Sequence, residues 1–194
     1  MPGRVPHQFH PETLGLVIGL DYCLRAILCV DGGFAVKGIV VFQSWWGSCK
    51  RIAEAITRGL IKEGHEVQIL AVEKAGKPDP SLDFAVIGAA TRWPGARPKI
   101  KRYAKKVIKA PFAGKPFATF STGGTVFEEE PNTQASDQLY RLLEEGGLLP
   151  LAPPFKAGIE GYKPPGKERG MLPETEVARA EEFGHELGAR LSGQ

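Results

Sequence analysis

The protein is a chain of 194 residues, which is the length of one domain with room for an appendage. Hydrophobic residues make up 42% of it and charged residues 24%, so the composition is that of a globular protein and excludes a disordered chain. The formal net charge of +3 is too small to argue by itself for binding to nucleic acid.

The first 35 residues differ from the rest of the chain. Prolines interrupt a polar start, and two apolar stretches follow at residues 14–20 and 22–30. These stretches could form two strands or a strand and a helix, because their periodicity does not decide. Residues 36–38 have the character of a natural chain start. The sequence therefore predicts that residues 1–35 are either an extension with a docking role or the product of a misplaced start codon.

From residue 36 onward, apolar strands alternate with amphipathic helices. The continuous apolar run at residues 38–42 is typical of a strand buried on both faces of a parallel sheet. Further strands are predicted at residues 67–72, 83–88, 116–120 and, as an irregular edge strand interrupted by proline, 148–151. Apolar residues at helical spacing predict helices over residues 52–60, 99–109, 139–143 and 174–191, and glycines at 64, 146 and 147 are stop signals.

This alternation predicts an α/β domain over residues 36–194. Its expected architecture is a three-layer, doubly wound, five-stranded parallel sheet with helices on both faces. In such folds a ligand binds beyond the carboxyl ends of the strands, at the point where the strand order reverses. The loops that follow the first, third and fourth strands are therefore the candidates for a binding site.

The first of these loops, at residues 44–50, combines hydroxyl groups, a glycine and the start of a helix. Unpaired N–H groups and the helix dipole favour an anion at such a place, with Ser48 as the candidate N-cap. Lys50 and Arg51 oppose the dipole, which is tolerable when a phosphate dianion lies among them. The alternative is a tight turn without a ligand. A cysteine at a helix start has a lowered pKa, so Cys49 is either a small residue facing the phosphate or a reactive thiol.

Residues 38–60 (GIVVFQSWWGSCKRIAEAITRGL) resemble the start of the flavodoxin family. In that family a hydroxyl-rich loop, roughly [ST]-x-T-G-x-T, wraps the phosphate of FMN. Trp46 and Cys49 stand where threonines are usual, which removes two hydroxyl donors and leaves backbone amides to hold the phosphate. The residues that fit the family pattern are Ser44, Gly47 and Ser48.

Two later loops extend the resemblance, which covers about residues 36–192. Residues 88–95 (GAATRWPG) are similar to the family's stretch that presents an aromatic ring to the flavin. Thr91 fits, Arg92 occupies the usual aromatic position, and Trp93 either stacks on the flavin or packs against its own loop. Residues 121–125 (STGGT) are similar to the glycine-rich loop along the flavin edge. The resemblance thus implies a flavodoxin-like fold and an FMN site made of Ser44, Trp45, Trp46, Gly47, Ser48, Cys49, Thr91, Arg92, Trp93, Ser121, Thr122, Gly123 and Gly124.

The function that the resemblance implies is electron transfer, or the reaction of a small flavin-dependent reductase. The protein then positions the flavin and tunes its potential. The sequence offers no Ser/His/Asp set and no carboxylate pair near the three loops, so no catalytic residue is predicted. The alternative is a binding module of the same fold that has lost FMN.

A run of positive charge accompanies the second loop. Between Arg92 and Lys115 the chain has nine basic residues and no acidic one. The run is either a solvated helix face or a surface that docks an acidic redox partner or an anionic substrate. Positive charge beside a flavin would also stabilise its anionic reduced form and raise its potential. A module without FMN could use the face at 92–115 for an acidic partner or nucleic acid. Few aromatic residues are interleaved with these basic residues, and Tyr103 is the one between Arg97 and Lys109, so stacking on single strands is poorly supported.

Other site classes are not expected. Three cysteines give an odd number without a CxxC pair, and the four histidines are scattered, which argues against a disulfide framework and a metal site. His65 is predicted to lie in a surface turn. The longest apolar run contains Asp21 and Arg25, each of which costs about 2.5–3.5 kcal/mol at the centre of a bilayer. We therefore expect no membrane segment and a cytoplasmic location, while the oligomeric state stays open.

Overall fold

The computed structural model describes residues 35–92, 95–110, 112–124, 134–161 and 170–193. Residues Ala35–Gln194 form one unit of the chain. The predicted extension at residues 1–35 lies, except for its last residue, outside the described part, so both explanations of it stay predictions.

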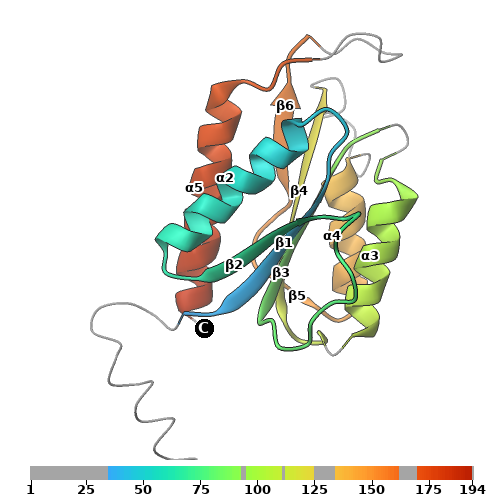
Figure 1. The fold of residues 1–194 in the computed structure, drawn as a ribbon, viewed down its shortest axis with the longest axis vertical. Coiled ribbons are helices and arrows are strands. Elements are labelled where there is room, and N and C mark those ends of the chain that lie inside the picture. Colours follow the sequence, from blue (N-terminus) through green and yellow to red (C-terminus); the bar gives the residue numbers. More distant parts are fainter. Residues whose placement is uncertain (1–34, 93–94, 111, 125–133, 162–169, 194) are drawn as a thin grey trace, which may run out of the picture. The chain divides into compact units, whose positions relative to one another are not determined.

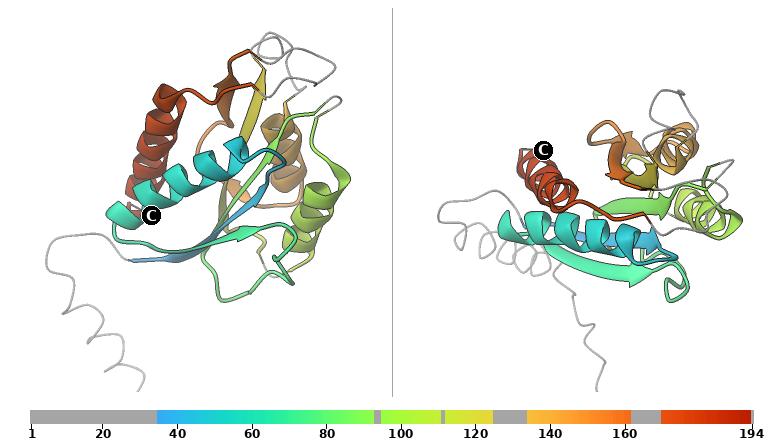
Figure 2. Two further views of the ribbon diagram at one scale, coloured as in Figure 1. Left: turned by 45° about the horizontal axis from the view of Figure 1, so that its top comes forward. Right: turned by 90° about the horizontal axis from the view of Figure 1, so that it is seen from above.

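The strands form one parallel sheet in the order β2-β1-β3-β4, with β5 and β6 both pairing with β4 (Figure 1). Helices α2 and α5 cover one face, and α3 and α4 cover the other (Figure 2). This arrangement confirms the predicted three-layer α/β fold. The strands are β1 Lys37–Gln43, β2 Glu66–Ala71, β3 Phe84–Ala90, β4 Pro116–Gly124, β5 Leu149–Pro150 and β6 Phe155–Ile159. The helices are α2 Ser48–Lys62, α3 Pro98–Lys109, α4 Ala135–Glu145 and α5 Glu174–Ser192.

The sheet forms because its central strands are apolar on both faces. In β1, Val40 and Phe42 join the core under α2 and α5, whereas Ile39 and Val41 join the core under α3 and α4. A continuous apolar strand of this kind is stable only with helices on both sides, which is what the connecting segments supply. The predicted helix stops are confirmed at Gly64 and Gly147, both of which adopt positive φ just after a helix ends.

The predicted fifth strand at residues 148–151 is only the first part of the edge. Leu149 lies opposite Pro116 of β4, whereas Phe155 lies opposite Phe120, so the edge has two more residues than β4 between these pairs. Pro153 and Pro154 fall in this interruption, where their missing N–H groups cost no ladder hydrogen bond. Beyond it the chain returns to β4 as β6, a strand that the sequence did not predict.

Strand β6 also changes the third predicted loop. Residues 121–124 were expected to leave the sheet after a strand that ends at residue 120. They instead continue β4, because β6 gives them a partner in register, from Ser121 opposite Lys156 to Gly124 opposite Ile159. The prediction of a loop at these positions was wrong, and the end of β4 is placed more rigidly than a loop would be.

His65 is a second correction. Its side chain is only 3% exposed, so the predicted surface turn is wrong. Its Nε2 lies 2.9 Å from the carbonyl oxygen of Gly188 in α5, and its Nδ1 accepts from the N–H of Val36 at 3.4 Å. Because one ring nitrogen faces a carbonyl and the other an N–H group, the hydrogen bonds fit a neutral ring protonated at Nε2. His65 therefore ties α5 to the entrance of β1.

Candidate functional site

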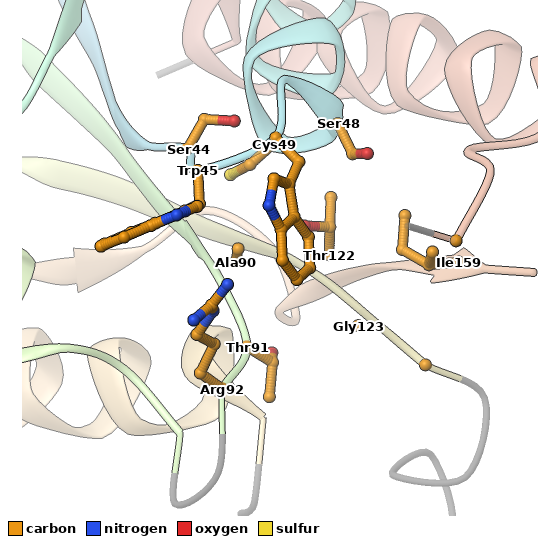
Figure 3. A pocket seen from close by; sticks show the side chains of 13 residues that line it. Ser44, Trp45, Ser48, Cys49, Ala90, Thr91, Arg92, Thr122, Gly123 and Ile159 are labelled. Carbon is orange, nitrogen blue, oxygen red and sulfur yellow. The ribbon is translucent and has the colours of Figure 1, made fainter. Parts of the chain in front are cut away.

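The three segments singled out from the sequence meet at the carboxyl edge of the sheet, around a pocket of about 50 Å³ (Figure 3). They come from the β1–α2 connection and from the ends of β3 and β4, which are neighbours in the sheet. The end of β6 and the segment before α5 close the remaining side. The lining residues are Ser44, Trp45, Trp46, Ser48, Cys49, Ala90, Thr91, Arg92, Thr122, Gly123, Gly124, Ile159 and Gly170.

Most of the predicted site residues therefore lie together, and two described ones, Gly47 and Ser121, do not line this pocket. Gly47 precedes α2, Ser121 points into the protein interior, and Trp93 lies outside the described residues. Ala90, Ile159 and Gly170 were not among the predicted site residues, although Ala90 belongs to the predicted second loop at residues 88–95. Ile159 could not have been found because its strand, β6, was itself missed.

The start of α2 differs from the sequence prediction in its cap. Gly47, at φ +96°, is the N-cap, and Ser48 is the first helical residue without a capping hydrogen bond. Gly47 holds the turn because its backbone is left-handed, a conformation that costs little only for glycine, and its N–H donates to Ser44 Oγ at 3.1 Å. The first backbone N–H groups of α2 have no carbonyl partner within the helix, so an anion could be bound there.

The positive side chains at the start of α2 do not line the pocket. Lys50 forms an ion pair with Glu54 at 3.5 Å, and Arg51 forms one with Glu174 of α5 at 2.6 Å. The expectation that both charges surround an anion is therefore not met in this arrangement. The attraction for an anion at this helix start rests instead on backbone N–H groups and the helix dipole, because no acidic residue occupies the first turn.

Arg92 lines the pocket and lies against both of its tryptophans. Its guanidinium carbon lies 4.9 Å from the ring centroid of Trp45 and 4.6 Å from that of Trp46. Figure 3 shows the Arg92 side chain reaching up from the end of β3 toward Trp45. Trp45 is 63% exposed and Trp46 39%, so these cation–π contacts lie at the mouth of the pocket and are weak, about 0.5–1 kcal/mol each.

Cys49 is fully buried at the pocket's inner wall, and this corrects the expectation of a reactive thiol. Burial removes the thiolate from water and raises the pKa of the Cys49 thiol far above its usual range. The hydrogen bond between the Thr122 hydroxyl and the sulfur lowers this pKa, but only in part. The helix-start effect that predicts a lowered pKa is thus outweighed by desolvation. Cys49 acts as a small apolar wall residue.

This burial predicts that Cys49 resists alkylation in the folded protein. Only the thiolate reacts, and the raised pKa leaves almost none of it at pH 8, so labelling by iodoacetamide should be at least about 100-fold slower than in urea. Peptide mapping by mass spectrometry separates Cys49 from Cys23 and Cys29. Labelling of Cys49 at the same rate in the folded and unfolded protein would contradict this account.

A network of hydrogen-bonded side chains behind the pocket joins the ends of β3 and β4 to the start of α4. The Thr91 hydroxyl donates to Gln134 Oε1 at 3.1 Å and accepts from the N–H of Ala135, the first residue of α4. The Ser121 hydroxyl bonds to the same Gln134 oxygen at 3.0 Å and to the Ser136 hydroxyl at 2.9 Å. Ser121 thus fixes the end of β4 to the start of α4. Gln134 was not predicted, because no local pattern marks a buried glutamine.

Two further kinds of feature are absent from the part of the chain that the structure describes. No three histidine, cysteine, aspartate or glutamate side chains of that part gather closely enough to hold a metal ion. Likewise, none of the helices described is both long and apolar enough to cross a membrane.

Comparison with known proteins identifies the fold. No family model matches the sequence, and no curated protein matches it either. Solved structures do match. A flavodoxin from the domain Archaea superposes with a TM-score of 0.64 at 17% identity, over 80% of this chain and 98% of the other. The chain has a flavodoxin-like fold.

Other structures agree with this identification. A Streptococcus pneumoniae flavodoxin gives a TM-score of 0.65 at 19% identity, over 79% of this chain and 99% of its own. The Flv1 flavodiiron core from Synechocystis gives 0.65 at 15% identity and covers 95% of this chain but 42% of that longer one. At such identities the likeness shows the flavodoxin-like fold alone, so what the pocket binds has to be argued from its own residues.

Proposed function

We propose that the pocket binds FMN and that the protein acts in electron transfer or as a small flavin-dependent reductase. The observation that carries the proposal is the place of the pocket. It lies at the carboxyl edge where the chain reverses direction across the sheet, from β1 outward to β2 and then back past β1 to β3. In doubly wound folds this switch point is where ligands bind, and here it also holds the open start of a helix.

The phosphate end of FMN suits the start of α2. Backbone N–H groups of its first turn have no carbonyl partner within the helix, the hydroxyls of Ser44 and Ser48 line the pocket beside them, and no carboxylate of that turn opposes a dianion. The exchange of two family threonines for Trp46 and Cys49 removes hydroxyl donors but none of these amides. We therefore assign the phosphate to this end.

The flavin ring requires Arg92 to move. A space of about 50 Å³ holds a few water molecules and not a three-ring system. Arg92, however, also lines a second, open hollow of about 510 Å³ on the side of α3, into which its flexible side chain can withdraw. Its departure would free Trp45 and Trp46 for stacking on a flat ring, and Gly123 and Gly124 add no side chains to the pocket wall.

When bound, FMN supplies the capacity to accept and donate one or two electrons. The chain's part is to bind and orient it, because the described residues of the lining include no histidine and no carboxylate that could act as an acid or a base. The nearby charge of Arg92 would favour the anionic reduced flavin over the neutral oxidised one. This environment fits an electron carrier or a reductase that relies on the flavin for its chemistry, working in the cytoplasm.

Titration of the flavin-free protein with FMN tests the proposal. We expect quenching of flavin fluorescence and a rise in melting temperature, since FMN at 100 times its dissociation constant adds about 2.7 kcal/mol to the free energy of unfolding. Tryptophan emission should change in the same titration because Trp45 and Trp46 lie at the pocket mouth. Absence of binding up to millimolar FMN would reject the proposal and favour a binding module without a flavin.

A further inference from the structure

The basic side chains on the two helical faces of the sheet differ in how many of them form ion pairs. On the face of α2 and α5, cations are neutralised within the fold: Arg51 pairs with Glu174 at 2.6 Å, while Arg58 and Lys62 both pair with Glu181, at 3.0 and 2.6 Å. These bridges join the two helices across their contact. Little of this positive charge is left to attract another molecule.

On helix α3 most of the positive charge has no ion-pair partner among the described residues. Its buried face holds Ile100, Tyr103, Ala104 and Val107, and its sequence contains six basic residues and no acidic one. Only Lys99 among them forms an ion pair with another described residue, Glu73, at 3.1 Å. We call the remaining five the α3 basic face: Lys101, Arg102, Lys105, Lys106 and Lys109. Unpaired like charges on one helix repel each other, so they favour the approach of a negative surface.

The α3 basic face continues into the open hollow beside the candidate FMN pocket. Lys101, Arg102 and Lys105 line this hollow together with Arg92 and Arg97, so five cations surround about 510 Å³ of open space. Arg92 belongs to the linings of both the hollow and the pocket. Arg97 reaches Trp45, with its guanidinium carbon 5.8 Å from the ring centroid. A molecule seated in the hollow would therefore touch the rim of the pocket.

We propose that the hollow and the α3 basic face form a docking surface for an acidic region of a partner protein. The docking itself does not depend on FMN. Only the interpretation that the docked partner exchanges electrons with the pocket rests on the proposed function. The charge complementarity is local, because the neighbouring helix α4 ends in two acidic residues, Glu144 and Glu145. An acidic patch of limited size fits this arrangement better than a long polyanion, which would extend onto these carboxylates.

The composition of the surface also favours protein over nucleic acid. Tyr103, the single aromatic residue of α3, is buried and cannot stack on a base. Binding of single strands relies on such stacking in addition to phosphate contacts. The hollow offers instead several flexible cations at one end of a helix, which suits carboxylates presented by a folded partner.

A matched pair of variants tests the docking surface. Lys101→Gln with Lys105→Gln removes two charges from the hollow, and Ala178→Glu with Ala189→Glu lowers the net charge by the same amount at exposed positions of α5. A short poly-L-glutamate peptide is the probe, because it presents an acidic patch of limited size, and tryptophan fluorescence at physiological salt follows its binding. We expect the lysine variant to bind it about tenfold more weakly than the wild type and the α5 variant to bind it within about twofold.

Two outcomes would overturn the proposal. An equal loss of affinity in both variants would mean that only the net charge matters. Single-stranded DNA of matched charge that binds the wild type more than about tenfold tighter than poly-L-glutamate, and loses that advantage in the lysine variant, would make the surface a nucleic-acid site. FMN titration of the same proteins separates the two proposals, since loss of FMN binding leaves the poly-L-glutamate result intact.

Discussion

Replacement of Gly184 by valine is expected to lower the free energy of unfolding by about 3 kcal/mol or more, because α2 and α5 touch through their backbones at this position. A Cβ on Gly184 would fall on the carbonyl oxygen of Ile56, and one on Gly59 would fall on that of Glu181. Neither obstacle is a side chain that can rotate away. The helices would have to separate, which opens the core between α5 and the sheet.

Urea denaturation followed by far-UV circular dichroism measures the effect, and the melting temperature should fall by roughly 6–12 °C. Gly193→Ala, at the C-cap that follows α5, is the control. A Cβ there would meet only the carbonyl oxygens of Ala189 and Arg190, at 3.6 and 3.9 Å, and the φ of −91° suits any residue. We expect this variant to stay within about 0.5 kcal/mol of the wild type. Equal stability of both variants would contradict the close crossing.

The order of most helices and strands could be predicted because each of these has a local pattern of apolar residues. The central strands that the sequence predicted are apolar on both faces, as in β1, and the helices repeat their apolar residues at helical spacing, as in α3. Strand β6 could not be found in this way. Its sequence, FKAGI, follows two prolines and contains a lysine and a glycine, so its extended state comes from pairing with β4 and not from its own preference.

The candidate site shows the same division between local and tertiary causes. Its three segments converge because the carboxyl ends of parallel strands share one edge of the sheet. This convergence could be predicted from the sequence. The local rule for a cysteine at a helix start gave the wrong pKa direction for Cys49, because its burial in the core that α2 forms with the sheet and α5 is a tertiary effect. The stacking of Arg92 on two tryptophans likewise depends on how β3 and the β1–α2 connection meet, which no pattern within either segment contains.

Replacement of Ser48 by aspartate is expected to weaken FMN binding by at least about 100-fold while the fold stays as stable as the wild type. Ser48 is the first residue of α2, where a carboxylate improves helix stability by about 0.3–1 kcal/mol through the helix dipole. The same carboxylate would repel a phosphate held by the neighbouring N–H groups. Two like charges at about 4 Å repel by about 4 kcal/mol at the effective dielectric constant of a protein surface, more than a 100-fold loss requires.

Riboflavin, which lacks the phosphate, provides the control ligand. Its affinity for the aspartate variant should stay within about threefold of the wild-type value, and Ser48→Ala should cost FMN less than about tenfold because it removes a single hydroxyl. Fluorescence titration with both ligands and a melting curve of each variant supply the comparison. If the aspartate variant binds FMN as well as the wild type does, the phosphate does not lie at the start of α2. Equal losses of affinity for FMN and riboflavin would instead mean that the substitution disturbs the part of the pocket that holds the flavin ring, since Trp45 and Trp46 belong to the β1–α2 connection that leads to Ser48.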